Sequence, residues 1–280
     1  MTPFRVACVQ FAPAFAEPHA NASRCAEWLQ DAADADASLV VFPEAAITGY
    51  CARSYEEARD IAVESDSDPM LRFADAVRAA GLHAVVGFAE RAGAELFNSA
   101  LVCGPDGPIG LYRKTHLPYL GFDKHAKRGS ALDVFELPFC KLGVLICYDI
   151  RVPEAARVLA LKGADIVALP TNWPDKAQRS PQIVCPTRAM ENRIYVAASS
   201  RVGEENGFSF IGMSRVVAPT GDVLASADSQ EETVIIADVD VLLARQKRVV
   251  IVPDEYELDT FGERQPELYD LISRRDTSAE

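Results

Sequence analysis

The thiol of Cys147 is the side chain whose setting most favours nucleophilic chemistry. Cys147 ends the apolar run 142–147, and Pro153 begins a predicted helix six residues later. A thiol on a tight bend between a strand and a helix is exposed at the rim of a sheet, and a nearby helix N-terminus favours the thiolate. The alternative is a buried cysteine that packs as a small hydrophobic residue, which is the usual fate of an unpaired thiol.

A second thiol and the candidate bases are less well placed. Cys51 lies in a loop next to Tyr50. Histidine is the common base for a thiol nucleophile, and of the four histidines only His116, two residues after Lys114, lies in a motif-like position. A cysteine–histidine pair of the protease type therefore has weak support.

Two charged side chains close predicted strands. Glu44 follows the strand 38–42 and has apolar residues on both sides. Burial would raise the pKa of this carboxyl toward that of a useful general base, whereas the alternative is a loop carboxylate paired with an arginine. Lys114 closes the strand 109–114. It offers a fixed positive charge to an oxyanion, and the alternative is a surface lysine with a packed stem.

Short apolar segments that alternate with helical ones must position these residues. The predicted strands are 4–10, 38–42, 83–89, 97–103, 109–114, 132–137, 142–147, 165–169, 194–200, 210–218, 223–227 and 233–239. The predicted helices are 21–35, 56–63, 69–80, 153–162 and 182–193. No linker rich in Gly, Ser or Pro divides the chain. We therefore expect one α/β domain over residues 1–280, with helices outside a mixed sheet system and a less regular tail at about 249–280.

Three segments, taken in this order, resemble one known family. Phe42-Pro-Glu44, Tyr112-Arg-Lys114 and Ile146-Cys147-Tyr-Asp149 are similar to the catalytic segments of the carbon-nitrogen hydrolase (nitrilase) superfamily. The resemblance begins at the first strand and includes the loop 169–174. It continues through 188–192, 210–214 and 219–221, so it covers nearly the whole chain.

The resemblance implies a four-layer α-β-β-α sandwich with mixed sheets and no metal or organic cofactor. It also implies a mechanism in which Glu44 takes the thiol proton and Cys147 attacks a carboxamide carbon. Lys114, helped by a backbone amide after Cys147, then stabilises the oxyanion. Ammonia leaves, and water activated by Glu44 hydrolyses the thioester.

One part of the family pattern has no obvious counterpart. Many members carry a second glutamate shortly after the lysine, which orients the substrate and the lysine. Here no glutamate occurs between Lys114 and Glu136. Asp123, with its shorter reach, and Glu136 are the two candidates for this role.

The segment after the cysteine bears on the substrate. Cys147-Tyr148-Asp149 resembles the amidase-type members, whereas nitrilases more typically carry Trp-Glu there and many carbamoyl hydrolases carry Trp-Asp. We expect a small-molecule amidase that releases ammonia and a carboxylic acid. A nitrilase or an N-carbamoyl amine hydrolase is the alternative, and the intact catalytic set argues against a non-catalytic binding protein of the same fold. The candidate substrate-binding residues are Tyr50, Tyr119, Asp123, Tyr148, Asn172 and Trp173.

Composition excludes several other classes. The chain of 280 residues has 28 Lys+Arg against 41 Asp+Glu, and this net charge of -13 opposes binding to nucleic acid. Seven cysteines without a CxxC pair argue against a disulfide framework or a structural zinc site. The N-terminal segment lacks the apolar stretch of a signal peptide, and no apolar run is long enough to span a bilayer. We therefore expect a cytoplasmic enzyme without a membrane partner.

The family resemblance also implies association between subunits. Members of the family usually pair through helices beside the active site. We expect a homodimer or a higher homo-oligomer in which 153–162 and 182–193 form the contact. The tail that contains 266–269 is expected to pack on a partner subunit.

Overall fold

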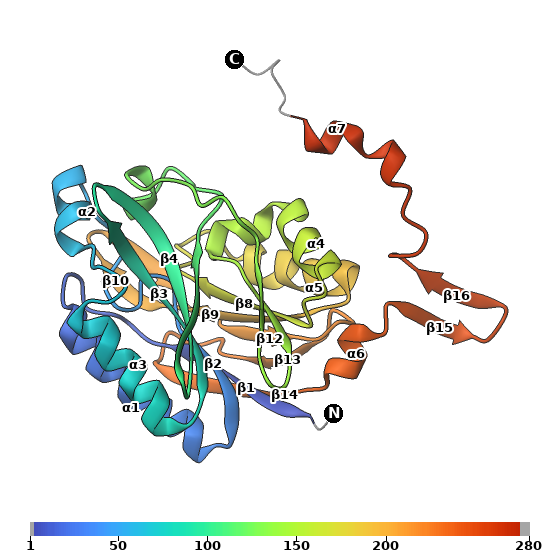
Figure 1. The fold of residues 1–280 in the computed structure, drawn as a ribbon, viewed down its shortest axis with the longest axis horizontal. Coiled ribbons are helices and arrows are strands. Elements are labelled where there is room, and N and C mark those ends of the chain that lie inside the picture. The colour runs from blue at the N-terminus through green and yellow to red at the C-terminus, as the bar shows by residue number, and fades with distance from the viewer. Residues whose placement is uncertain (1–2, 275–280) are drawn as a thin grey trace. The chain divides into compact units, whose positions relative to one another are not determined.

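The computed structural model describes residues 3–274, and Figure 1 shows their arrangement. The chain divides into two units at the bond between Arg245 and Gln246. The first unit holds the two large sheets and the long helices. The second holds a hairpin of β15 (Arg248–Val252) and β16 (Tyr256–Asp259), followed by α7 (Asp270–Ser273).

The first sheet has six strands in the order β14-β1-β2-β3-β4-β5. Their bounds are Thr233–Val239, Phe4–Gln10, Ala37–Val41, His83–Ala92, Glu95–Gly104 and Gly107–Arg113. The three strands β1, β2 and β3 run parallel, and the remaining neighbours pair antiparallel. Glu44 follows the end of β2, and Lys114 follows the end of β5.

The second sheet also has six strands, in the order β13-β12-β9-β8-β7-β6. Their bounds are Val223–Ser226, Arg215–Val217, Tyr195–Ser200, Ile166–Thr171, Lys141–Val144 and Val134–Glu136. Here β7, β8 and β9 run parallel. The carboxyl ends of parallel strands are where α/β proteins place their ligands. Cys147 and Asn172 follow the ends of β7 and β8.

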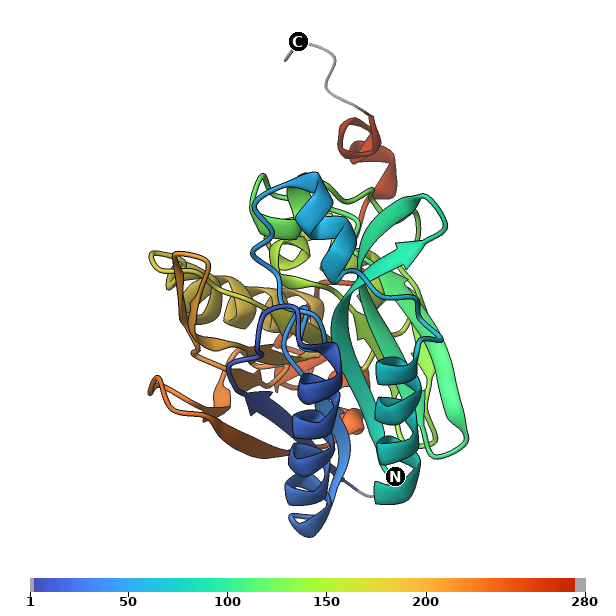
Figure 2. The same ribbon diagram turned by 90° about the vertical axis from the view of Figure 1, so that its left-hand side faces the viewer.

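Helices cover the outer faces of both sheets. Figure 2 shows α1 (Pro18–Asp34) and α3 (Asp68–Ala80) side by side along the first sheet. On the second sheet α4 (Pro153–Leu161) packs against α5 (Cys185–Asn192). The inner faces of the two sheets pack on one another where β1 meets β9 and where β2 and β3 meet β8. The fold is therefore the expected four-layer α-β-β-α sandwich.

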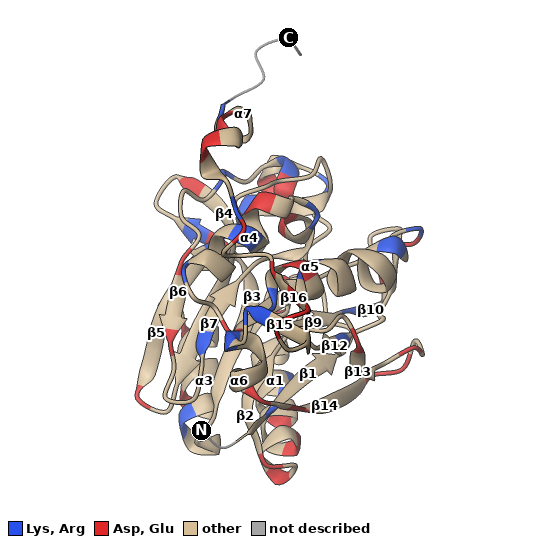
Figure 3. Ribbon diagram, turned by 90° about the vertical axis from the view of Figure 1, so that its right-hand side faces the viewer, with Lys and Arg blue, Asp and Glu red and all other residues tan. Residues whose placement is uncertain are grey.

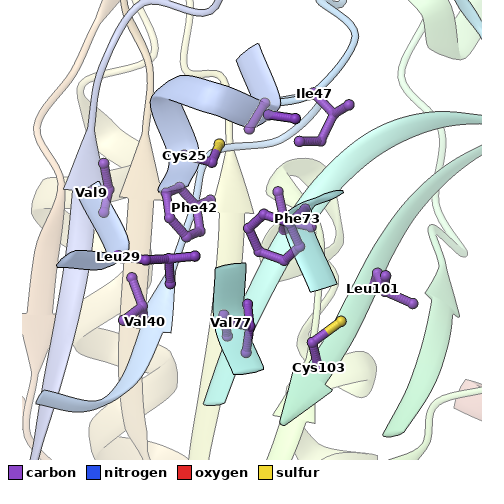
Figure 4. Packing of buried hydrophobic residues seen from close by; sticks show 14 of the residues in the cluster. Val9, Cys25, Leu29, Val40, Phe42, Ile47, Phe73, Val77, Leu101 and Cys103 are labelled. Atoms are coloured by element: carbon purple, nitrogen blue, oxygen red, sulfur yellow. The ribbon is translucent and has the colours of Figure 1, made fainter. Parts of the chain in front are cut away.

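The outer layer of the first sheet has a dense apolar core (Figure 4). Leu29 of α1 and Val77 of α3 are fully buried against β2 and β3. The rings of Phe42 and Phe73 meet edge to face with centroids 5.6 Å apart. Phe42 immediately precedes Pro43 and Glu44, so this packing anchors the backbone that carries the carboxylate.

The structure differs from the sequence predictions at a few elements. The predicted strand 142–147 stops at Val144, because the chain turns into a 3₁₀ helix at Cys147–Arg151. The predicted helix 182–193 begins as a π-helical turn, Ser180–Val184, and becomes α5 at Cys185, next to Pro186. The predicted strand 210–218 splits into β11 (Phe208–Ile211) and β12.

The first unit also contains the short elements α2 (Tyr55–Ile61), β10 (Val202–Glu205) and α6 (Val241–Arg245) and a 3₁₀ helix at Gly121–Lys124. The β10–β11 hairpin was not predicted. Figure 3 shows that the charged residues lie mainly on helices, loops and strand ends. In the described part of the chain, no helix combines the length and the apolar character needed to cross a membrane. Because most charged residues lie on helices, loops and strand ends, the few charged side chains buried inside the sandwich are exceptions to this pattern.

Candidate active site

Three of those buried charges form one cluster. The Nζ atom of Lys114 lies 2.6 Å from Oε1 of Glu44 and 2.6 Å from Oδ2 of Asp123. All three side chains are fully buried. Glu44 comes from the loop after β2, and Asp123 comes from the 3₁₀ helix Gly121–Lys124. Asp123 is therefore the second carboxylate, beside Glu44, that contacts the lysine.

Two neutral side chains hold the carboxylates in place. The amide Nδ2 of Asn98, on β4, donates to Glu44 and to Asp123 at 2.7 Å each. The hydroxyl of Tyr50 donates to Oδ2 of Asp123 at 2.9 Å. Asp123 thus has three donors, whereas Oε2 of Glu44 is buried and has no hydrogen-bond partner among the described residues.

Burial and charge make Glu44 more basic than an ordinary carboxylate. Burial raises the pKa of Glu44, Lys114 lowers it and Asp123 raises it, with a net upward direction. Burial alone would lower the pKa of Lys114, but Asp123 and Glu44 outweigh it and raise that pKa. The lysine therefore stays charged while the glutamate can exchange a proton.

The backbone at Cys147 confirms the predicted bend. Its φ of 44° lies in the left-handed region, which a residue with a side chain seldom adopts. Strain of this kind is found at functional sites where the surroundings enforce it. Cys147 is half-buried, and the other six cysteines are buried.

The expectation of a stabilised thiolate is wrong. The pKa of Cys147 is raised to about 12: burial and then Glu44 raise it, while Lys114, the Thr171 side chain and the Asn172 backbone lower it by less. The helix predicted at Pro153 is present as α4, but Cys147 lies in the separate 3₁₀ helix Cys147–Arg151 that precedes it. A nucleophilic role for this thiol would therefore require a base to remove its proton, and Glu44 is close enough to shift the pKa of the thiol.

A cavity of about 170 Å³ opens on the thiol. It is lined by Tyr50, Pro118, Leu120, Cys147, Tyr148, Arg151, Asn172, Trp173, Pro174, Ala177 and Ser180. Four of the six predicted substrate-binding residues are in this lining. Both side-chain polar atoms of Asn172 are buried and have no hydrogen-bond partner within the described residues.

The other two predicted substrate-binding residues lie elsewhere. Asp123 is buried behind Lys114 and does not line the cavity. Tyr119 is 89% exposed, and its ring lies 5.3 Å from Nζ of Lys124. Nothing in the geometry of the cavity supports a substrate contact for Tyr119.

The remaining sequence candidates are also placed away from the thiol. Glu136 lies on the edge strand β6 and pairs with Lys141 at 3.2 Å, so it does not meet Lys114. Cys51 is buried, and its backbone amide donates to Glu205 at 2.6 Å. Nδ1 of His116 lies 2.8 Å from Oδ1 of Asp149, and within residues 3–274 no hydrogen bond joins a histidine to Cys147.

Sequence reasoning missed two residues of the site. Asn98 joins Glu44 and Asp123 only because β4 pairs with β3, a long-range contact with no local signal. Arg151 is the only charged residue in the cavity lining, and within the described residues its guanidinium has no acidic partner. Its place four residues after the nucleophile was the available clue. No group of three or more metal-binding side chains comes together in residues 3–274.

Comparisons with known proteins give matches to one family and one fold. The family described as "Carbon-nitrogen hydrolase" matches residues 5–249. A nitrilase from Pyrococcus abyssi is 40% identical over 266 residues, which are 95% of this chain and 98% of that protein. An omega-amidase from Xenopus tropicalis is 33% identical over 267 residues, and the match covers 86% of this chain and 90% of that protein. The solved structure of an amidase from Nesterenkonia sp. superposes with a TM-score of 0.79 at 25% identity, covering 95% of both chains.

Proposed function

The chain belongs to the carbon-nitrogen hydrolase family, and we propose that it is an amidase that hydrolyses a small carboxamide through a thioester on Cys147. One observation carries the proposal. The carboxylate of Glu44, whose Oε2 atom has no partner among the described residues, and the ammonium of Lys114 lie close enough to Cys147 to shift the pKa of its thiol, which faces a cavity. A base, an oxyanion partner and a nucleophile are thus together.

The first half-reaction forms the thioester. Glu44 takes the thiol proton while Sγ attacks the carbonyl carbon, and the oxygen that becomes negative is stabilised by Lys114. The tetrahedral intermediate collapses when Glu44 returns its proton to the amide nitrogen, and the C–N bond breaks to release ammonia. In the second half-reaction Glu44 takes a proton from water, and the hydroxide attacks the thioester. The products are the carboxylic acid and the free thiol.

The lining of the cavity favours an amide over a nitrile. Asn172 presents one unpaired donor and one unpaired acceptor beside the thiol. A carboxamide can satisfy both because it has an N–H donor and a carbonyl acceptor, whereas a nitrile has only an acceptor. The Pyrococcus relative is named a nitrilase, so a nitrile remains the alternative substrate. The Xenopus relative is named an omega-amidase, which supports an amide substrate.

The same cavity suggests a short, negatively charged substrate. A cavity of about 150 Å³ is enough for a molecule the size of benzene, so this one suits an amide of similar length. Arg151 is its only charge. A guanidinium with no acidic partner is suited to bind a carboxylate at the far end of such an amide.

A matched set of substrates tests the proposal. Succinamate, butyramide, 4-aminobutyramide, 3-cyanopropanoate and N-carbamoyl-β-alanine would each be assayed for ammonia and carbon dioxide. We expect ammonia without carbon dioxide from the amides, with kcat/KM for succinamate about tenfold above that for butyramide. Arg151→Gln should remove the difference. A chelator should not change the rate.

The nucleophile is tested by two cysteine variants. Cys147→Ala should abolish ammonia release and any covalent acyl adduct seen by mass spectrometry, while Cys51→Ala should keep both. Hydrolysis of the nitrile but of no amide would overturn the amidase proposal. Activity in Cys147→Ala would overturn the mechanism.

Assembly and location remain proposals. Leu161 of α4, Ile183 of the π-helical turn before α5, and Met190 of α5 are 46%, 49% and 54% exposed. Such apolar side chains on adjacent helical segments support a homodimer or higher homo-oligomer. The tail as a subunit contact, a cytoplasmic location and the lack of nucleic-acid or membrane partners stay predictions. Sedimentation of the full chain would test the assembly.

A further inference from the structure

A buried carboxylate links the segment that carries the nucleophile to the segment that carries the lysine. We propose that Asp149 is a positioning residue that fixes the separation of Lys114 and Cys147. The inference rests on the roles proposed above for those two residues. Asp149 is fully buried, lies two residues after Cys147 and does not line the cavity.

One set of contacts holds the bend of the nucleophile. Oδ2 of Asp149 accepts from the backbone amide of Ile146 at 3.0 Å, the residue before Cys147. The backbone amide of Asp149 donates to the carbonyl of Ile146, also at 3.0 Å. These two bonds close a loop around Cys147 and hold its left-handed backbone.

A second set of contacts reaches the residues that flank Lys114. The hydroxyl of Tyr112 donates to Oδ2 at 2.7 Å. Oδ1 accepts from the backbone amide of His116 at 2.8 Å and from the hydroxyl of Thr115 at 3.1 Å. Nδ1 of His116 lies 2.8 Å from the same oxygen. An ionised carboxylate only accepts, so this nitrogen carries the hydrogen.

The two segments come from different sheets. Lys114 follows β5 of the first sheet, and Cys147 follows β7 of the second. Apolar packing between sheets is not directional, so by itself it does not fix their relative position to a fraction of an ångström. Charge-assisted hydrogen bonds are short and directional. Asp149 supplies such bonds to both sides at once.

The consequence is catalytic geometry. The oxyanion forms on a carbon bonded to Sγ of Cys147 and must lie within hydrogen-bond distance of Lys114. A displacement of about 1 Å between such groups costs on the order of 100-fold in rate. Because the carboxylate does not line the cavity, its loss should lower kcat and leave KM nearly unchanged.

Asp149→Asn is the central test. Asparagine keeps the shape but replaces one accepting oxygen with a donor, which opposes either the Ile146 amide or the donors around Lys114. We expect kcat for succinamate to fall about 100-fold with KM within about twofold. Asp165→Asn is the matched control, because Asp165 is also buried and accepts from a backbone amide, that of Lys141, and from Arg245. It should lose similar thermal stability and keep kcat.

The pH profile of Cys147 alkylation separates positioning from stability. Iodoacetamide should react with Cys147 alone, since the other six thiols are buried. Lys114 lowers the pKa of this thiol, so a displaced lysine moves the profile to higher pH. Removal of a nearby negative charge would by itself move it to lower pH. Asp165→Asn should leave the profile unchanged.

The outcomes are distinguishable. An alkylation profile and kcat for Asp149→Asn that match Asp165→Asn would overturn the inference, whereas a wild-type protein that hydrolyses no amide would overturn the proposed function instead. If Asp149→Asn does not fold, Tyr112→Phe removes a single bond to the carboxylate. It should lower kcat about tenfold and shift the profile in the same direction. An unchanged kcat in Tyr112→Phe would also overturn the inference.

Discussion

Two buried ionic clusters lie on either side of Tyr50, and they are built on opposite principles. The backbone amide of Tyr50 donates to Oε1 of Glu205 at 2.8 Å, and its hydroxyl donates to Asp123. Glu205 pairs with Arg201 at 2.5 Å and receives the amide of Cys51 as well. Both of its oxygens are bonded, and one cation faces one carboxylate.

The cluster around Lys114 is unbalanced. One ammonium faces two carboxylates, and Oε2 of Glu44 has no partner within the described residues. A buried group left without a partner costs stability. The balanced pair therefore leaves no buried charge unsatisfied, whereas in the proposed mechanism the unbalanced cluster keeps a carboxylate ready to take a proton. The contrast distinguishes a structural from a catalytic role.

Glu44→Gln should have the largest effect on activity. Loss of a general base and acid lowers kcat on the order of 1,000-fold. The folded-state pKa of Glu44 is raised, so the contribution of this group to stability is fully present at pH below its unfolded pKa and is lost as pH rises through the folded pKa. At pH 7 the variant should therefore melt at the same or a higher temperature. A lower melting temperature with full activity would show that Glu44 has a structural and not a catalytic role.

Arg201→Met should have the opposite signature. It leaves the Glu205 charge buried without its cation, which costs about 3–5 kcal/mol of stability. The ring of Phe210, 4.5 Å from the guanidinium, also loses a cation–π contact. Urea denaturation should show this loss, while kcat per folded molecule stays within about threefold of wild type. A stable variant with a large loss of kcat would show that the balanced pair has a catalytic role.

The pH dependence of the wild-type enzyme probes the unbalanced cluster. The base must be ionised, so kcat/KM should fall about tenfold per pH unit below the pKa of Glu44. The ordinary pKa of a glutamate is 4.5, and that of Glu44 is raised above it. The fall in kcat/KM should therefore begin at a higher pH than it would for an ordinary glutamate. The acid limb should be missing in Glu44→Gln. A wild-type profile flat down to pH 4 would contradict the assigned base.

The sequence predicts where the proposed catalytic groups lie along the chain better than it predicts the residues that surround them. Glu44 and Cys147 follow apolar runs that the chain itself marks as strands, and the fold follows from the same pattern. Asn98 and Glu205 could not be placed, because their contacts depend on how strands far apart in the chain pair. The choice between Asp123 and Glu136 also needed the fold, since only the structure shows which carboxylate reaches Lys114.

Tyr50→Phe should give the smallest change in kcat. It tests whether the residue that contacts both clusters contributes to catalysis through its hydroxyl. The ring, 5.9 Å from Nζ of Lys114, stays, and the backbone bond to Glu205 stays. Only the hydroxyl bonds to Asp123 and to the Leu120 carbonyl are lost. Asp123 keeps Lys114 and Asn98, so kcat should fall about fivefold, less than for loss of a bond to an otherwise unpaired charge.

Tyr195→Phe is the matched control for this smallest effect. Tyr195 is also buried, and its hydroxyl bonds to the backbone of Asp240 at 3.2 Å. This variant should lose a similar amount of stability, about 1 kcal/mol, without any change in kcat. If both variants keep wild-type kcat, the hydroxyl of Tyr50 does not orient Asp123 for catalysis. The two clusters would then share a residue without sharing a function.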